Sequence, residues 1–166
     1  MMKETLLISA CFLGRRCKYD GGSNLLPREL LDRLAAHYRL IPVCPETAGG
    51  LPIPREPSER RDGGVRARDG ADVTAAYERG AQTALKLCER FGCRKALLKE
   101  RSPSCGSGVI YDGTFSHTLV SGDGWTAEKL RAHGVVLYGE STAESLLDND
   151  NDVGATLVVA RAVKKM

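Results

Sequence analysis

Hydrophobic residues fall in four short runs along the chain, and their spacing predicts buried strands. The runs cover residues 5–10, 39–44, 95–99 and 135–138. Each run is apolar with little alternation, as expected for strands that are covered on both faces in a parallel sheet. Between the runs, apolar residues recur at helical spacing over residues 27–38, 73–91 and 126–133. This alternating order predicts an α/β fold: a small doubly wound, mostly parallel sheet, Rossmann-like, with helices on both faces.

Helix boundaries are predicted from capping residues. Asp72 and Thr126 each precede a helical pattern and are expected to cap its N-terminus. Pro27 opens the first helix, whereas Gly92 and Gly134 end the two later ones.

The connections between these elements differ in length. Residues 45–70 hold four prolines and five glycines without periodicity, which predicts a long irregular loop. Residues 109–111 and 118–120 are expected to form short extended pieces around a turn at Asp112 and Gly113.

The length of 166 residues predicts one α/β domain over residues 1–143, followed by an extension or tail at 144–166. The tail contains a polar linker and an aliphatic run at 155–163. The sequence does not determine the oligomeric state.

Composition narrows the environment of the protein. The hydrophobic content of 42% suffices for an ordinary core, and the net charge of +3 comes from 24 basic and 21 acidic residues without a basic block. This balance predicts a mixed surface and disfavours a nucleic-acid partner.

No segment approaches the ~20 apolar residues of a membrane span. Residues 8–11 resemble a lipoprotein cleavage box, but the apolar stretch before them is too short for a signal peptide. We therefore expect a cytoplasmic protein with reduced thiols and no membrane partner.

Three cysteines stand where predicted strands end. Cys11 and Cys44 follow the first two strands directly, and Cys105 follows the third after one short turn. If these strands are parallel neighbours, the three thiols meet at the carboxyl edge of the sheet, where open α/β folds bind ligands. Three thiolates form a soft metal site that is one ligand short of a closed four-coordinate shell, which favours chemistry over a structural role.

Other candidate residues lie close to these cysteines. Glu46 sits in a proline-stiffened turn beside Cys44, and is either an acid/base group or a solvated loop residue. The glycine–serine loop 102–108 either offers backbone N–H groups to an anion or cluster sulfide, or is a flexible polar turn. Cys88 and Cys93 are expected to be structural. No CxxC pair is present, which disfavours a zinc finger or ribbon.

Several motifs together resemble the bacterial family known as domain of unknown function 523, whose relatives include thiouracil desulfidases. The matching segments are 8–21, 43–46, 50–55, 70–74 and 99–106. The resemblance covers about residues 8–138. It implies a [4Fe–4S] cluster held by Cys11, Cys44 and Cys105, with one iron left open to substrate sulfur. It also implies that Glu46 is the catalytic acid/base group and that Ser102 positions substrate or water.

The activity implied by this resemblance is a non-redox desulfidase reaction on a small thiolated compound such as a thiopyrimidine. Water deprotonated by Glu46 would attack a carbon whose sulfur is bound to the open iron. Cys17 could be a neighbouring thiol, a persulfide carrier or an alternative ligand. Arg55 could contact substrate or form a structural salt bridge. A module that carries a cluster or sulfur without catalysis remains an alternative, as does a partner acting on thiolated tRNA; a zinc site is disfavoured.

Overall fold

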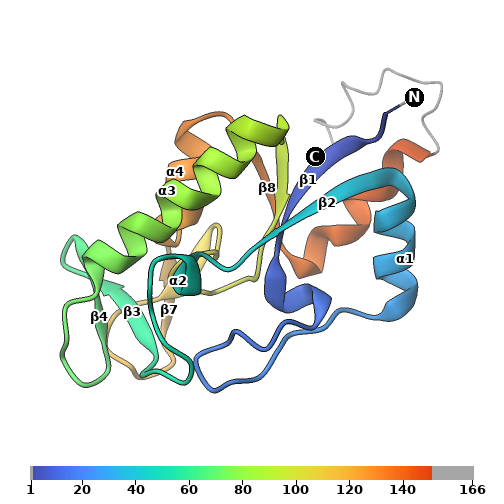
Figure 1. The fold of residues 1–166 in the computed structure, drawn as a ribbon. Helices are drawn as coiled ribbons and strands as arrows, with labels where there is room; N and C mark the ends of the chain where they lie inside the picture. Colours follow the sequence, from blue (N-terminus) through green and yellow to red (C-terminus); the bar gives the residue numbers. More distant parts are fainter. Residues whose placement is uncertain (1, 151–166) are drawn as a thin grey trace.

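A computed structural model describes residues 2–150 of the chain. Its centre is a parallel four-stranded sheet in the order β2-β1-β5-β8 (Figure 1). The strands are β1 (Glu4–Ser9), β2 (Tyr38–Val43), β5 (Lys95–Leu97) and β8 (Val136–Tyr138). The predicted α/β fold with a parallel sheet is confirmed, and the predicted strands differ from the observed ones only by one or two residues at their ends.

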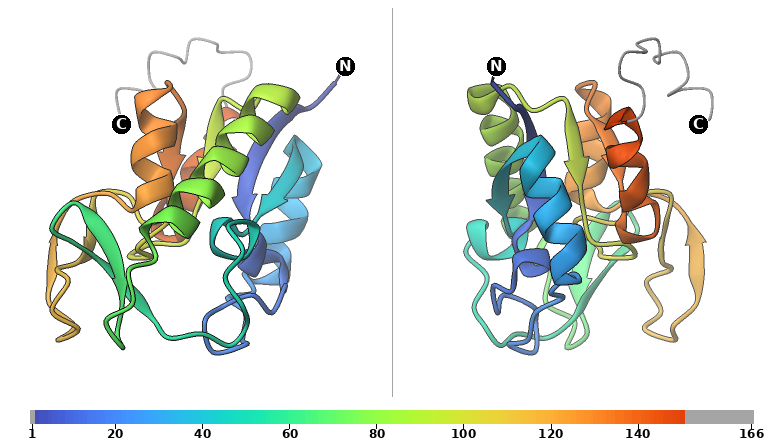
Figure 2. Two further views of the ribbon diagram at one scale, coloured as in Figure 1. Left: turned by 60° about the vertical axis from the view of Figure 1, so that its left-hand side comes forward. Right: turned by 90° about the vertical axis from the view of Figure 1, so that its right-hand side faces the viewer.

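Helices cover both faces of this sheet (Figure 2). One face carries α1 (Arg28–His37) and the 3₁₀ segment η2 (Glu140–Asp150), and the other carries α3 (Thr74–Phe91) and α4 (Trp125–Ala132). Successive β1 side chains alternate between the two layers: Leu6 and Ile8 join the core beneath α1, whereas Leu7 joins the core beneath α3. This alternation explains why β1 is apolar at nearly every position.

Neither predicted N-cap residue stands at the N-cap position of its helix. Helix α4 begins at Trp125 with Gly124 as its N-cap, so Thr126 lies inside the helix. Thr126 is fully buried, and its hydroxyl contacts the Ser104 hydroxyl at 2.8 Å. A Cβ atom on Gly124 would stand 2.5 Å from the Ser104 carbonyl oxygen, so this close approach requires glycine at the cap. At α3 the N-cap is Val73, which makes no side-chain cap hydrogen bond, so the predicted cap Asp72 lies one residue too early. Asp72 still accepts a hydrogen bond from the amide of Thr74, the first residue of the helix.

The prediction of an irregular loop over residues 45–70 is also wrong. That segment contains a short helix, α2 (Pro45–Ala48), and an antiparallel hairpin of β3 (Ser58–Arg61) and β4 (Gly64–Ala67). The hairpin strands are too polar to show an apolar pattern. Arg60 attaches the hairpin to α4, since its guanidinium lies 4.6 Å from the Trp125 ring centre and 2.6 Å from the Glu128 carboxylate.

A second hairpin confirms the two predicted extended pieces. It pairs β6 (Val109–Tyr111) with β7 (Leu119–Ser121). Glu59 of β3 accepts hydrogen bonds from the Gly113 and Phe115 amides at 2.9 and 3.0 Å, which ties the turn of this hairpin to the first one. Both hairpins lie beyond the carboxyl edge of the sheet, below it in Figure 1.

The start of the predicted extension packs against the domain. Leu146 and Leu147 are buried beside α1, and the Tyr38 hydroxyl donates a hydrogen bond of 2.7 Å to the Leu146 carbonyl. The division at residue 143 stays a prediction, and the aliphatic run at 155–163 lies outside the described residues. In the described part of the chain, no helix has the length and apolar character needed to cross a membrane.

Two glycines allow α2 to lie directly on α3. A Cβ atom on Gly80 would stand 1.9 Å from the Pro45 carbonyl oxygen, and one on Gly49 would stand 2.0 Å from the Ala76 carbonyl oxygen. The backbones of α2 and α3 are therefore in direct contact beside Cys44 and Glu46.

We predict that Gly80→Ala lowers the free energy of unfolding by about 1–3 kcal/mol, because the added methyl group overpacks this contact. The sign is opposite to the usual gain when alanine replaces glycine inside a helix. Urea denaturation followed by circular dichroism measures the change. Gln82→Ala, an exposed position on the same helix, is the control. A Gly80→Ala protein as stable as this control would contradict the packing argument.

Candidate functional site

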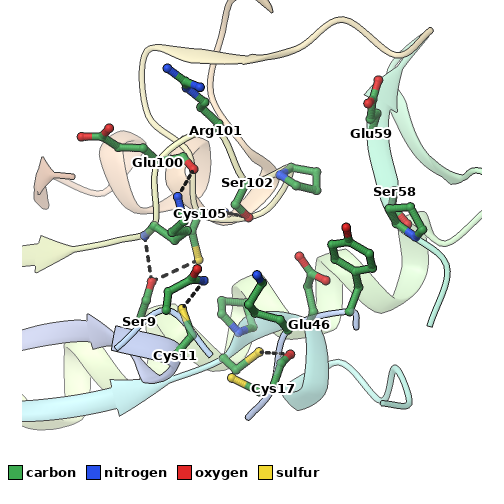
Figure 3. Close-up of a pocket in the computed structure, with 18 of the residues that line it drawn as sticks. Ser9, Cys11, Cys17, Glu46, Ser58, Glu59, Glu100, Arg101, Ser102 and Cys105 are labelled. Carbon is green, nitrogen blue, oxygen red and sulfur yellow. Dashed lines mark hydrogen bonds between the residues drawn. The ribbon is translucent and has the colours of Figure 1, made fainter. Parts of the chain in front are cut away.

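A cavity opens at the carboxyl edge of the sheet, where the topology reverses. The chain passes from β1 outward to β2, and then returns to β5 on the other side of β1. Such a switch point leaves a crevice between adjacent strand ends. The cavity there has a volume of about 410 Å³, and four cysteines are among its lining residues: Cys11, Cys17, Cys44 and Cys105 (Figure 3).

Each of the three predicted ligands comes from a different connection. Cys11 lies in the 3₁₀ turn Ala10–Leu13 directly after β1, and Cys44 is the residue between β2 and α2. Cys105 lies in the loop between β5 and β6. The sheet thus brings the three thiols to one cavity, as the strand pattern predicts, while their role as ligands stays a prediction.

The loop that carries Cys105 is held from both sides. The Ser102 hydroxyl oxygen accepts hydrogen bonds from the amides of Ser104 and Cys105, at 3.0 and 2.9 Å. On the other side, the Thr126 and Ala127 amides at the start of α4 donate to the Ser104 carbonyl. The amides of residues 104 and 105 are therefore used inside the loop, which does not favour the anion-binding role considered for it.

Three thiols that line one cavity are the soft donors that an iron–sulfur cluster requires. Among residues 2–150, no group of three or more His, Cys, Asp or Glu side chains is arranged to hold one ion. A [4Fe–4S] cluster binds each thiolate at a different iron, so its ligands stand farther apart around a larger volume. Three thiols around an open cavity match that requirement.

Burial controls the protonation of these thiols. Burial raises the pKa of Cys11, and a hydrogen bond from the Asn24 side chain offsets only part of the effect. It raises the pKa of Cys105 in the same way, and the Ser9 hydroxyl offsets only part of that effect. Burial and the neighbouring Cys44 raise the pKa of Cys17 to about 12. Cys11, Cys17 and Cys105 are therefore thiols at neutral pH, because burial outweighs the nearby Lys99 and Arg15 charges. A bound metal centre supplies further positive charge and displaces the protons.

Glu46 and Arg55 form a buried ion pair at the cavity wall. The Nε and Nη2 atoms of Arg55 lie 3.0 and 2.9 Å from Glu46 Oε1, and the two side chains are only 8% and 16% exposed. Arg55 Nη2 also donates to the Cys17 carbonyl at 2.9 Å. Glu46 lines the cavity, whereas Arg55 stands behind it. Of the two alternatives for Arg55, these contacts favour the salt bridge.

Tyr77 is a site residue that the sequence analysis missed. It is almost completely buried, it lines the cavity, and its hydroxyl lies near the Glu46 and Ser58 side chains. Burial and the nearby Glu46 charge raise the pKa of Tyr77 well above its usual range. It belongs to the apolar face of α3, so its sequence pattern is that of an ordinary core residue and carries no signal of function.

Comparison with known proteins supports the resemblance seen in the motifs. The model of a family described as 2-thiouracil desulfurase matches residues 6–142. The chain belongs to this family. A solved structure of similar fold is the "[4Fe-4S]-dependent thiouracil desulfidase TudS", with 46% sequence identity and a TM-score of 0.85, covering 91% of this chain and 100% of that one. The uncharacterized protein YbbK of Bacillus subtilis (strain 168) is 34% identical over 152 residues, which are 86% of this chain and 99% of YbbK.

In this member of the 2-thiouracil desulfurase family, we expect the positive charge of Arg55 to offset the free-energy cost of burying the Glu46 carboxylate. We predict that Arg55→Met lowers the free energy of unfolding by about 3–5 kcal/mol, because it leaves an unpaired charge in the wall. Adding Glu46→Gln should recover much of the loss. Urea denaturation of the single and double variants measures both effects.

Arg28→Met is the control for this cycle, since Arg28 pairs with Asp32 on the exposed face of α1 and should cost about 0–1 kcal/mol. If Arg55→Met and Arg28→Met lower the free energy of unfolding equally, the Glu46–Arg55 pair stabilises the protein no more than an exposed ion pair does.

Proposed function

We propose that this protein is a [4Fe–4S]-dependent, non-redox desulfidase that removes sulfur from a small thiolated compound such as a thiopyrimidine. The observation that carries the proposal is the convergence of Cys11, Cys44 and Cys105 on one cavity that Glu46 and Ser102 also line. Its support comes from membership in the 2-thiouracil desulfurase family and from 46% identity to a protein described as a [4Fe-4S]-dependent thiouracil desulfidase.

Cys11, Cys44 and Cys105 would hold the cluster, leaving one iron without a cysteine. When bound, the cluster would supply a sulfur-seeking Lewis acid that polarises a C=S bond. The overall reaction consumes one water, replaces the C=S bond with C=O and releases hydrogen sulfide. No electron donor or acceptor is required.

Glu46 would take the proton from the attacking water. Its carboxylate faces the cavity, and the Arg55 guanidinium fixes the Oε1 oxygen while Tyr77 contacts the same carboxylate. A carboxylate held in this way keeps one orientation toward the substrate, which is what a general base needs.

Ser102 would position the substrate or the water. Its hydroxyl oxygen accepts from two backbone amides, so the hydroxyl proton remains to be donated. Side chains from both hairpins complete the wall, among them Ser58, Tyr111 and Phe115. A cavity of about 410 Å³ with aromatic residues in its lining suits a small planar heterocycle.

We predict that anaerobically reconstituted protein converts 2-thiouracil into uracil and sulfide in equal amounts without a reductant. Cys105→Ala should lose both the bound iron and the activity, because a cluster ligand is missing. Iron analysis, absorption in the visible range and chromatographic assay of uracil give the result. Cys88→Ala removes a buried cysteine of α3 that does not line the cavity, and should keep both.

A colourless wild-type protein after careful anaerobic reconstitution would refute the cluster. Retention of labelled sulfide on a brown protein, with no uracil formed, would instead favour a sulfur-carrying module. Equal iron content in Cys105→Ala and Cys88→Ala would remove Cys105 from the ligand set.

For Glu46→Gln we expect normal iron content and a kcat lower by about 10²–10⁴-fold, the usual contribution of general acid–base catalysis. Anaerobic turnover assays on iron-matched samples measure the loss. Glu59→Gln is a control, since Glu59 also lines the cavity but contacts only the hairpin turn in the described structure. Undiminished turnover in Glu46→Gln would exclude Glu46 as the base.

A further inference from the structure

A buried serine donates a hydrogen bond to one of the proposed ligands. Ser9, the last residue of β1, is only 3% exposed, and its Oγ atom lies 3.6 Å from Cys105 Sγ (Figure 3). The Lys99 amide donates to the same Oγ atom at 3.0 Å. An amide can only donate, so Ser9 accepts at that contact and its single proton is left for the sulfur. The direction of the hydrogen bond is therefore fixed by the backbone that follows β5.

Asn24 makes the matching contact with a second proposed ligand. Its side-chain Nδ2 atom, a donor, lies 3.3 Å from Cys11 Sγ. The Asn24 backbone amide also donates to the Cys11 carbonyl at 3.0 Å, which fixes the residue relative to that cysteine. The third proposed ligand has a different neighbour: Cys44 Sγ lies 3.9 Å from the Cys17 carbonyl oxygen, which accepts a hydrogen bond and donates none.

These two donors come from separate parts of the chain and use different chemical groups. Each donor is neutral and supplies one hydrogen bond to one sulfur. Such bonds favour negative charge on sulfur, and outer contacts of this kind orient metal ligands and tune reduction potentials. Both contacts place an O–H or N–H group against the sulfur of a proposed ligand.

We propose that Ser9 and Asn24 are positioning residues, which hold the Cys105 and Cys11 sulfurs by hydrogen bonds and thereby retain the cluster and set its reduction potential. This inference rests on the proposed function, because it takes the two cysteines to be cluster ligands. Neither residue is assigned a step in the desulfurisation itself.

The test uses the reconstituted full-length protein and measures bound iron rather than turnover. Ser9→Ala should weaken cluster retention against an iron chelator by about 10–100-fold, the usual effect of losing an outer contact of a metal ligand. It should also move the midpoint potential of the cluster to a more negative value, since the reduced cluster loses a stabilising donor. Asn24→Asp, which replaces the donor by an acceptor of the same shape, should change both quantities in the same direction.

Two further variants separate this role from a structural one. Ser104→Ala removes another buried serine hydroxyl, next to Cys105 in sequence, whose partner is the Thr126 hydroxyl and not a sulfur. It should leave the potential unchanged even if it lowers stability. Ser9→Thr keeps the hydroxyl group and should restore a potential close to that of the wild type.

The possible failures are distinguishable. If the wild-type protein takes up no iron, the proposed function fails and this inference fails with it. If the wild type binds its cluster but Ser9→Ala and Asn24→Asp match Ser104→Ala in potential and in retention, only the inference is overturned. Asn24 lies in a loop, so its variant keeps the test decisive if Ser9→Ala folds poorly.

Discussion

The parallel pairing of β1 with two neighbours is the constraint on which the site depends. Leu7 of β1 is in register with Ile41 of β2 on one side and with Ala96 of β5 on the other. This register brings the three strands to an end at the same edge, although the cysteines that follow them are far apart in the chain. In this register Leu6, Leu7 and Ile8 are fully buried, with Leu6 and Ile8 in one layer of the core and Leu7 in the other. The position of the sulfurs is thus a by-product of hydrophobic packing.

Electrostatics then shape what this edge of the sheet can hold. Burial raises the pKa values of Cys11, Cys17 and Cys105, and the Lys99 and Arg15 charges near Cys11 and Cys17 offset only part of this effect. Glu46, a buried carboxylate in the same wall, has its own partner in Arg55 and does not need the metal centre to balance it. The Glu46–Arg55 pair is thus complete within the protein, whereas the proposed cluster would balance the charge of the sulfur group.

How much could be predicted from the sequence depends on how local each signal is. Long apolar runs revealed the sheet and the helices, and motif resemblance revealed the family. The hairpin of β3 and β4 was not predicted from the sequence, because Arg60 and Glu59 stabilise it through contacts with distant residues and it has no apolar pattern. Thr126 resembled a cap because no sequence rule shows that the backbone approaches Ser104 at Gly124. Tyr77 was hidden among core residues, since its contact with Glu46 forms only when α3 packs against the edge. The proposed ligands, the roles of Glu46, Ser102 and Cys17, and the cytoplasmic location stay predictions.

The central claim is that three cysteines hold a four-iron cluster and leave one iron accessible to substrate sulfur. Mössbauer spectroscopy of protein reconstituted with ⁵⁷Fe, recorded with and without 2-thiouracil, tests this most directly. The account predicts that one of the four irons changes its signal when the thiolated compound binds, while the three cysteine-bound irons do so much less. Four irons that ignore the compound, or a spectrum without a four-iron cluster, would contradict it.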